Sequence, residues 1–315
     1  MADFGVKIGK LKLDNPVTVA SGTFGYGEEF ADLIDLKKLG AIVTKTITLK
    51  ARQGNPMPRT CETPAGMLNS IGLENPGIDR FIEDKVPVLK KIGIPAIVSI
   101  ASEGDTGEFI TLASRLNGLK EVSAIELNIS CPNIHRVRGT GYRVQKKKCR
   151  LIAQDPKAAY ELVKAVRKTT QKTLITKLSP NVTDITEIAL AAEEAGTDAV
   201  SLINTFYGMR IDVDTGKPKL AQVTGGLSGP AIRPIALRMV WEVYKKVKIP
   251  IIGMGGIMDL NSALEFFMAG ASVISVGTAN FINPKTSIEI INGLNQYLIK
   301  NKIKDIYSLI GSIKI

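Results

Sequence analysis

The sequence predicts an α/β fold, a (β/α)8 TIM barrel, because short apolar segments alternate with amphipathic helical segments along the whole chain. The apolar segments are continuous, which is typical of parallel strands that are buried on both faces. The 315 residues fit one large barrel, so we expect a single domain over residues 1–315. An open, doubly wound sheet is the alternative, and eight repeating units favour closure.

Local patterns predict where the elements lie. We expect strands at residues 16–20, 41–44, 95–99, 124–128, 173–177, 199–203, 250–253 and 272–276. We expect helices at residues 28–39, 106–118, 156–169, 182–195, 231–247, 260–269 and 286–299. Gly40, Gly196 and Gly270 directly follow three of these helices, as capping glycines often do. Residues 6–13 predict a short hairpin that seals the other end of the barrel.

Three long connections interrupt the regular alternation. They follow strands two, four and six and span residues 45–94, 129–155 and 204–230. Each connection leaves the carboxyl end of a parallel strand, and this end of a barrel carries the active site. We therefore expect the three insertions to build up the active-site face.

The net charge of +11 leaves two interpretations open, a solvated surface or attraction of anionic partners. Seven Lys and Arg side chains lie between Arg136 and Arg150, where Tyr142 is the one aromatic residue. Because no interleaved aromatic residues are present to stack on bases, we favour a solvated basic loop and expect no nucleic-acid partner. No apolar run approaches a membrane span, and no signal peptide is visible. We expect a cytoplasmic protein without a membrane partner.

Cysteine and histidine are scarce, which limits the kinds of metal site and catalytic triad that the chain can form. The chain has Cys61, Cys131 and Cys149, without a CxxC pair, and its single histidine is His135. An iron–sulfur cluster or zinc site within this chain is therefore not expected, and a Ser-His-Asp triad would have to use His135. We predict no metal site and assign no role to His135.

Polar residues or glycines follow nearly every predicted strand. They are Ser21, Lys45, Thr46, Ser99, Asn128, Lys177, Asn204, Thr205, Gly255, Gly256, Gly277 and Thr278. Because parallel strand ends meet on one rim, this set predicts a polar active site there. The glycine pairs after strands seven and eight indicate a phosphate site, with ordinary tight turns as the alternative.

Several rim side chains suit an anionic, amide-containing ring. Lys45 and Lys177 would contact an anion, unless each forms a structural ion pair. The amides of Asn69, Asn128, Asn133 and Asn204 could match the donor and acceptor edge of a pyrimidine dione, although asparagine is also common in turns.

Cys131 follows strand four directly and is the candidate catalytic base. A thiol with an ordinary pKa of about 8.5 needs little tuning to act near neutral pH. The alternative is a small buried apolar side chain, which is the usual role of a free cysteine. Its place on the rim beside Asn128 and Asn133 favours the catalytic interpretation, which Cys61 and Cys149 lack.

Nine segments resemble the dihydroorotate dehydrogenase family, and together they span almost the whole chain. They are Ala20–Gly25, Val43–Thr46, Gly54–Arg59, Met67–Gly72, Glu126–Asn133, Lys177–Asn181, Thr224–Gly229, Gly253–Gly256 and Val276–Ala279. A cysteine base is similar to the soluble class 1 enzymes. The segments Ser179–Asp184 and Ile203–Thr205 are similar to the NAD-linked class 1B. The basic segment after Asn133 departs from the shorter glycine-rich stretch that is usual there.

The resemblance implies an FMN-dependent oxidation of (S)-dihydroorotate to orotate in pyrimidine synthesis. Cys131 would remove the C5 proton while hydride passes from C6 to flavin N5, and Lys177 would stabilise the reduced flavin. The residues implied to hold FMN are Ser21, Lys45, Thr46, Ser99, Asn128, Lys177, Ile203, Gly229, Gly255, Gly256, Gly277 and Thr278. Those implied to hold the substrate are Lys45, Asn69, Ser70, Ile71, Gly72, Leu73, Asn128, Asn133, Asn204 and Thr205.

The resemblance also implies partners. Class 1B catalytic chains form a homodimer and pass electrons to NAD through a subunit that carries FAD and an iron–sulfur cluster, in a heterotetramer of two plus two chains. The rival interpretations are the fumarate-reducing class 1A homodimer, another pyrimidine-acting flavin enzyme, a flavin-free barrel isomerase and a basic nucleic-acid-binding protein.

Overall fold

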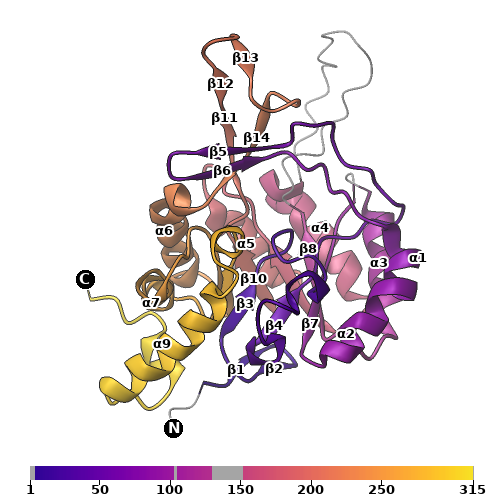
Figure 1. Cartoon of the computed structure of the whole chain (residues 1–315). Coiled ribbons are helices and arrows are strands. Elements are labelled where there is room, and N and C mark those ends of the chain that lie inside the picture. The colour runs from indigo at the N-terminus through magenta and orange to yellow at the C-terminus, as the bar shows by residue number, and fades with distance from the viewer. Residues whose placement is uncertain (1–3, 103–104, 130–151, 315) are drawn as a thin grey trace.

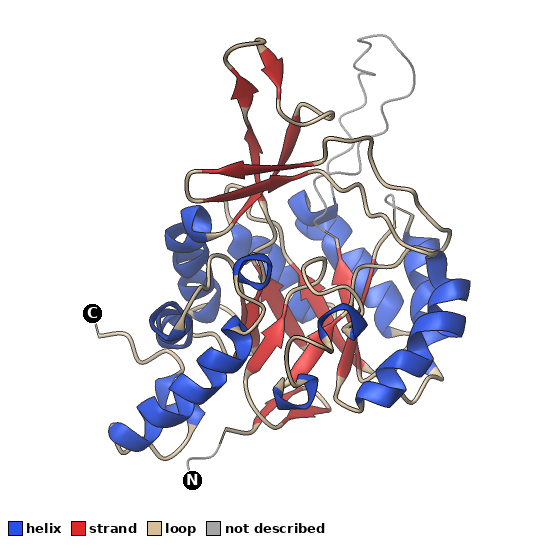
Figure 2. Ribbon diagram, viewed as in Figure 1, coloured by secondary structure: helices blue, strands red, loops and turns tan. Residues whose placement is uncertain are grey.

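A closed barrel of eight parallel strands forms the centre of the molecule (Figures 1 and 2). The computed structural model describes residues 4–102, 105–129 and 152–314. In spatial order, the barrel strands are β10 (Ala199–Leu202), β15 (Ile251–Gly253), β16 (Val273–Val276), β3 (Val17–Val19), β4 (Ala41–Val43), β7 (Ala96–Ile100), β8 (Ala124–Asn128) and β9 (Thr173–Lys177). Every residue of these strands is buried, which explains their continuous apolar sequences. The predicted TIM barrel is confirmed.

Helices surround the barrel and bury their apolar faces against it. They are α1 (Gly77–Arg80), α2 (Val86–Ile92), α3 (Thr106–Asn117), α4 (Pro156–Arg167), α5 (Ile185–Glu194), α6 (Arg233–Tyr244), α7 (Leu260–Ala269), α8 (Ala279–Ile282) and α9 (Thr286–Lys300). Six of the seven predicted helices are present with small changes at their ends. No helix among the described residues is long and apolar enough to cross a membrane.

The predicted helix at residues 28–39 is wrong. The structure has two separate 3-10 turns there, Glu28–Phe30 and Leu36–Lys38. The side chain of Asp35 accepts a hydrogen bond from the backbone N–H of Lys37 and starts the second turn. Short polar side chains compete in this way with the helical backbone bonds. The helix that follows β4 lies instead within the long connection, where α1, a π-helical turn (Phe81–Lys85) and α2 are consecutive.

The predicted N-terminal hairpin is confirmed. It consists of β1 (Val6–Ile8) and β2 (Leu11–Leu13), whose apolar side chains are buried while the residue between them on each strand is exposed. The hydroxyl of Thr173, the first residue of β9, accepts hydrogen bonds from the backbone N–H groups of Lys10 and Leu11. The hairpin is thus joined to the amino end of the barrel, opposite the strand ends that carry the rim residues.

The insertions after β4 and β10 pair with each other above the barrel (Figure 1). Strands β5 (Thr60–Thr63) and β6 (Gly66–Asn69) come from the first, and β11 (Phe206–Met209) and β14 (Thr224–Ser228) from the second. They form one antiparallel sheet in the order β11-β14-β6-β5, which we call the mouth sheet. The hairpin of β12 (Ile211–Asp212) and β13 (Lys217–Pro218) extends away from it. These two insertions therefore lie on the expected face, whereas most of the third, residues 129–155, lies outside the described ranges.

Candidate active site

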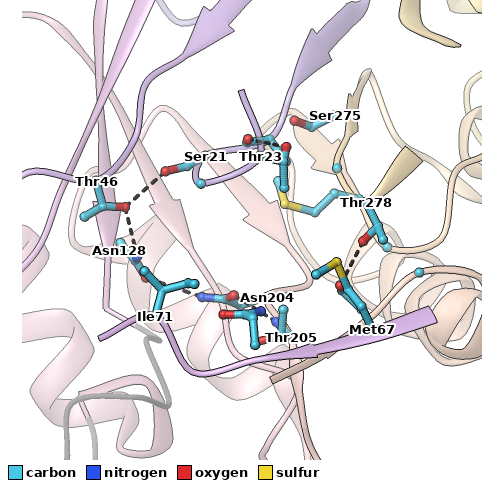
Figure 3. A pocket seen from close by; sticks show the side chains of 18 of the residues that line it. Ser21, Thr23, Thr46, Met67, Ile71, Asn128, Asn204, Thr205, Ser275 and Thr278 are labelled. Carbon is cyan, nitrogen blue, oxygen red and sulfur yellow. Dashed lines mark hydrogen bonds between the residues drawn. The ribbon is translucent and has the colours of Figure 1, made fainter. Parts of the chain in front are cut away.

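A cavity of about 350 Å³ lies between the carboxyl ends of the barrel strands and the mouth sheet (Figure 3). This volume is within the usual range for small-molecule sites. Residues from all eight barrel strands, or from the turns that follow them, contribute to the cavity or to the hydrogen bonds directly behind its wall. The predicted rim residues that line the cavity are Ser21, Lys45, Thr46, Asn128, Lys177, Asn204, Thr205, Gly255, Gly256, Gly277 and Thr278. Ile203, which the family resemblance implies, lines it as well.

Hydroxyl and amide groups form a connected chain along one wall. The Thr46 hydroxyl lies 3.0 Å from the Ser21 hydroxyl and 2.9 Å from that of Ser99, and it accepts a hydrogen bond of 3.2 Å from the Asn128 amide. The Asn204 side-chain amide donates to the side-chain oxygen of Asn128 at 3.4 Å. Ser99 is fully buried behind Thr46 and does not line the cavity. Because these bonds fix the side chains, the wall presents preorganised polar groups.

Glycine turns after β15 and β16 form the opposite wall. Gly256 has φ +78°, and a Cβ atom there would lie 2.7 Å from the Cβ atom of Arg233 and 2.8 Å from the carbonyl oxygen of Gly229. Within the described part of the chain, no group accepts a hydrogen bond from the backbone N–H of Gly255, Gly256, Gly277 or Thr278. Such N–H groups, left without a partner beside a cavity, suit a phosphate.

A hydrogen bond joins the mouth sheet to the wall formed by Gly255, Gly256, Gly277 and Thr278, which we call the phosphate-type wall. The Thr278 hydroxyl donates a 2.8 Å hydrogen bond to the Ser228 hydroxyl at the end of β14, and Gly229 follows Ser228 directly. Gly229, which the family resemblance implies, also lines the cavity. The turn after β16 and the end of the mouth sheet therefore form one continuous surface.

Three cationic side chains and one carboxylate of the described residues line the cavity. Lys177 is 5% exposed, and no carboxylate of the described residues lies within 4 Å of its ammonium group. Burying an ammonium group without a counter-ion is costly, so Lys177 favours an anionic ligand. The Lys45 ammonium instead lies 3.9 Å from the Glu74 carboxylate, which also forms an ion pair with Arg59. Lys45 thus has a carboxylate neighbour and still lines the cavity, whereas Lys177 has no such neighbour among the described residues.

The segment predicted to hold the substrate lies at the edge of the cavity. Asn69, Ile71, Gly72 and Leu73 line it, whereas Ser70 does not. Ser70 is fully buried, and its backbone N–H donates to the carbonyl oxygen of Arg59. Alternate residues of an extended segment point to opposite sides, which explains why Ser70 differs from its neighbours.

Four residues singled out in the sequence lie outside the described ranges, namely Cys131, Asn133, His135 and Cys149. Among the described residues, no group of three His, Cys, Asp or Glu side chains is arranged to hold a metal ion. Sequence reasoning did not select several cavity-lining residues, among them Arg59, Met67, Glu74, Ser228, Met254 and Phe281. Arg59 could have been selected, because it ends the segment Gly54–Arg59, which resembles the family. Nothing local in the sequence indicates that Arg59 and Glu74 meet.

The fold and the cavity define the class of the protein, a (β/α)8 barrel with a polar cavity at the carboxyl ends of its strands and glycine turns after the last two of them. The family model for dihydroorotate dehydrogenase matches residues 4–298. The chain therefore belongs to the dihydroorotate dehydrogenase family, as its resemblance predicted.

Individual relatives are similar over nearly their full length. A protein of Trichlorobacter lovleyi is 55% identical over 309 residues, which cover 98% of each chain. A protein of Geobacter metallireducens is 54% identical with 99% of each chain covered, and one of Bacteroides thetaiotaomicron is 51% identical with 100% of each covered. All three are named dihydroorotate dehydrogenase B (NAD(+)), catalytic subunit.

Proposed function

We propose that this chain is the FMN-binding catalytic subunit of an NAD-linked dihydroorotate dehydrogenase, which oxidises (S)-dihydroorotate to orotate in de novo pyrimidine synthesis. The observation that carries the proposal is the cavity itself. Backbone N–H groups that have no partner among the described residues, a buried lysine and two linked asparagine amides surround one space at the barrel mouth. The names of the full-length relatives support the same activity and the NAD-linked subtype.

The residues of the cavity fit FMN. The turns at Gly255, Gly256, Gly277 and Thr278, with Gly229 beside them, would receive its phosphate through backbone N–H groups. Lys177 would lie near the polar edge of the ring system and stabilise negative charge there. Ser21, Thr46, Asn128 and Ile203 would complete the ring site, with Ser99 acting through its hydrogen bond to Thr46.

The substrate would lie between this ring site and the mouth sheet. Asn128 and Asn204 would pair with the amide edge of the pyrimidine, because an asparagine side chain both donates and accepts hydrogen bonds. Lys45 would contact the carboxylate. The other proposed substrate contacts are Asn69, Ile71, Gly72, Leu73, Asn133 and Thr205, with Ser70 supporting them from behind.

The reaction removes a proton from C5 and a hydride from C6 of dihydroorotate. Bound FMN supplies the two-electron acceptor for that hydride. Cys131, as a thiolate, would take the C5 proton and become a neutral thiol, so that charge and hydrogen atoms balance. The asparagine amides that bind the ring would orient the C5–H bond toward Cys131. Orientation and proximity of this kind supply much of the rate acceleration.

The electrons would leave through a second subunit. The relatives are named catalytic subunits, which implies a separate partner. We propose that this partner carries FAD and an iron–sulfur cluster, because the three cysteines of this chain are too few and too scattered to hold one. Two catalytic chains as a homodimer and two electron-transfer chains would form a cytoplasmic heterotetramer. The proposal includes no nucleic-acid or membrane partner.

Anaerobic mixing of the FMN-loaded chain with dihydroorotate tests the proposal. We expect the oxidised flavin absorption to bleach and orotate to form in a one-to-one ratio with the flavin. Addition of fumarate should not restore the colour quickly, whereas fast reoxidation would identify the fumarate-reducing subtype. A chain that binds FMN but does not bleach with dihydroorotate would contradict the activity.

A further inference from the structure

Glu74 is the one carboxylate that lines the cavity among the described residues. It comes from the loop after β6, and its Oε2 atom lies 3.9 Å from the ammonium group of Lys45, which follows β4. The same oxygen forms an ion pair and hydrogen bond with Arg59, which precedes β5. The three side chains form a cluster with a net charge of +1 at the edge of the cavity.

The cluster is accessible to a ligand. The side chains of Lys45, Arg59 and Glu74 are 32%, 22% and 41% exposed, respectively, and all three line the cavity. Any ligand carboxylate that contacts the Lys45 ammonium must therefore approach the Glu74 carboxylate as well. Two like charges a few ångströms apart repel each other appreciably near a protein surface. Glu74 thus opposes the attraction that Lys45 and Arg59 exert on an anion.

We propose that Glu74 is a specificity-determining residue that limits how tightly the site holds the carboxylate shared by substrate and product. The inference rests on the proposed function and deepens it. Oxidation of the C5–C6 bond does not change the ring carboxylate, so its contacts bind substrate, transition state and product alike. Such uniform binding lowers KM without raising kcat, and it delays release of the product. Partial neutralisation of Lys45 and Arg59 by Glu74 avoids that delay.

A purely structural clamp is the alternative role for Glu74. The Arg59–Glu74 pair joins the start of the mouth sheet to the loop that carries the proposed substrate contacts. If the clamp were the whole role, its removal would loosen the loop and weaken every ligand, whether charged or neutral. If the charge is what matters, removal of the Glu74 carboxylate should strengthen the binding of an anionic ligand and leave the binding of a neutral ligand unchanged. The two roles therefore predict different changes in the ratio of the Kd for a charged ligand to the Kd for a neutral one.

The experiment compares the wild-type holoenzyme with Glu74→Gln, which keeps the shape and the hydrogen-bonding capacity of the side chain. Orotate and its neutral methyl ester are titrated against the flavin absorption spectrum. We expect Glu74→Gln to lower the Kd of orotate about tenfold and to leave that of the methyl ester unchanged. The gain should shrink at 1 M salt because exposed charges are screened. In Glu74→Gln the KM for dihydroorotate should fall together with the Kd of orotate, without a rise in kcat.

Two further variants separate charge from position. Glu62→Gln removes one negative charge from the exposed face of β5, outside the cavity, and should leave both Kd values unchanged. Glu74→Asp keeps the charge and should bind orotate more like wild type than like Glu74→Gln. Unchanged or weaker orotate binding in Glu74→Gln would overturn the inference. A wild-type holoenzyme that binds no orotate would instead overturn the proposed function.

Discussion

Asn75 and Thr48 exchange two hydrogen bonds that hold the proposed substrate loop on the barrel. The Thr48 backbone N–H donates to the Asn75 side-chain oxygen at 3.1 Å, and the Asn75 amide donates to the Thr48 hydroxyl at 2.8 Å. The same amide group donates to the carbonyl oxygen of Leu73 and its oxygen accepts from the N–H of Gly77. Asn75 is buried, so all of its hydrogen-bonding capacity is used within the protein.

Asn75→Ala should therefore destabilise the protein and loosen the loop. The substitution leaves buried N–H groups at Thr48 and Gly77 without partners, and we expect a loss of about 2–4 kcal/mol in the free energy of unfolding. The KM for dihydroorotate should rise, because Leu73 loses its anchor. Urea denaturation and steady-state kinetics measure the two effects. Asn301→Ala, on an exposed residue near the end of α9, should change stability by less than about 0.5 kcal/mol. Equal effects of the two substitutions would contradict this role.

Two glycines of the phosphate-type wall should respond differently to alanine. At Gly256, positive φ and backbone contact make a Cβ atom strained, so Gly256→Ala should cost about 1–3 kcal/mol of stability even without FMN. At Gly277, the nearest atom to a new Cβ would be the Ala20 Cβ atom at 3.5 Å, an ordinary contact. Gly277→Ala should therefore fold normally but bind FMN at least about tenfold more weakly, because the phosphate could not approach the backbone.

Thermal denaturation of the FMN-free chains and the recovery of flavin fluorescence on dilution separate the two effects. If Gly277→Ala held FMN as tightly as wild type does, the phosphate would not lie against this turn. If Gly256→Ala were as stable as wild type without FMN, neither the positive φ nor the contacts with Gly229 and Arg233 would constrain that position.

Replacement of the proposed base should stop turnover without loss of the cofactor. Cys131→Ala should retain FMN and lose most of the rate of anaerobic bleaching, because nothing else is proposed to take the C5 proton. Cys131→Ser should regain part of the rate only at higher pH, since a hydroxyl ionises far less readily than a thiol. Cys61→Ala is the matched control, because Cys61 lies in β5 outside the cavity. Unchanged bleaching by Cys131→Ala at neutral pH would eliminate Cys131 as the base.

The helix that follows the β15 turn should carry an acid-sensitive cap. The carboxylate of Asp259 accepts hydrogen bonds of 2.8 Å from the backbone N–H and the hydroxyl of Ser262 at the start of α7. These bonds, the backbone bond first, lower the pKa of Asp259 below its usual value. The stabilisation is therefore complete above the unfolded pKa of about 3.9 and disappears as the pH falls through the lower, folded pKa.

Asp259→Ala should accordingly cost about 1 kcal/mol at pH 7 and progressively less at pH values below about 4. Asp259→Asn should keep most of the cap at pH 7, because the asparagine side chain also accepts the hydrogen bond, and its contribution should not vary with acid. Urea denaturation at several pH values gives the comparison. A cost for Asp259→Ala that is constant between pH 7 and pH 3 would show that the carboxylate is not the stabilising form.

The barrel strands were predictable because each is a local apolar run whose identity does not depend on its neighbours. Their burial on both faces makes the pattern unambiguous. The helix at residues 28–39 was predicted wrongly because apolar spacing alone does not weigh the capping tendency of Asp35. The helical residues 77–92 were missed inside a long connection, where Asn75, Pro76 and Gly77 suggest turns rather than a helix start.

The candidate site was predictable where it depends on strand ends. Once the barrel is assumed, the rim positions follow from geometry, and eleven of the twelve residues proposed for FMN line the cavity, Ser99 being the exception. The Lys45–Glu74–Arg59 cluster was not predictable, since its members come from three separate segments with no shared motif. The same holds for the hydrogen bond that joins Thr278 to Ser228.

The amino-acid sequence by itself determined the order of the barrel elements and the polar character of the rim, because these depend on periodicity and composition within short windows. It also indicated the family, through nine segments that resemble it. Only the tertiary structure decided that the two long insertions pair as one sheet over the cavity. Asn69 and Gly226 meet in that sheet although 157 positions separate them, and the Asn69 amide donates to the Gly226 carbonyl oxygen at 3.3 Å. Pairing of this kind depends on where the closed barrel brings the insertions, a long-range condition that no local pattern encodes.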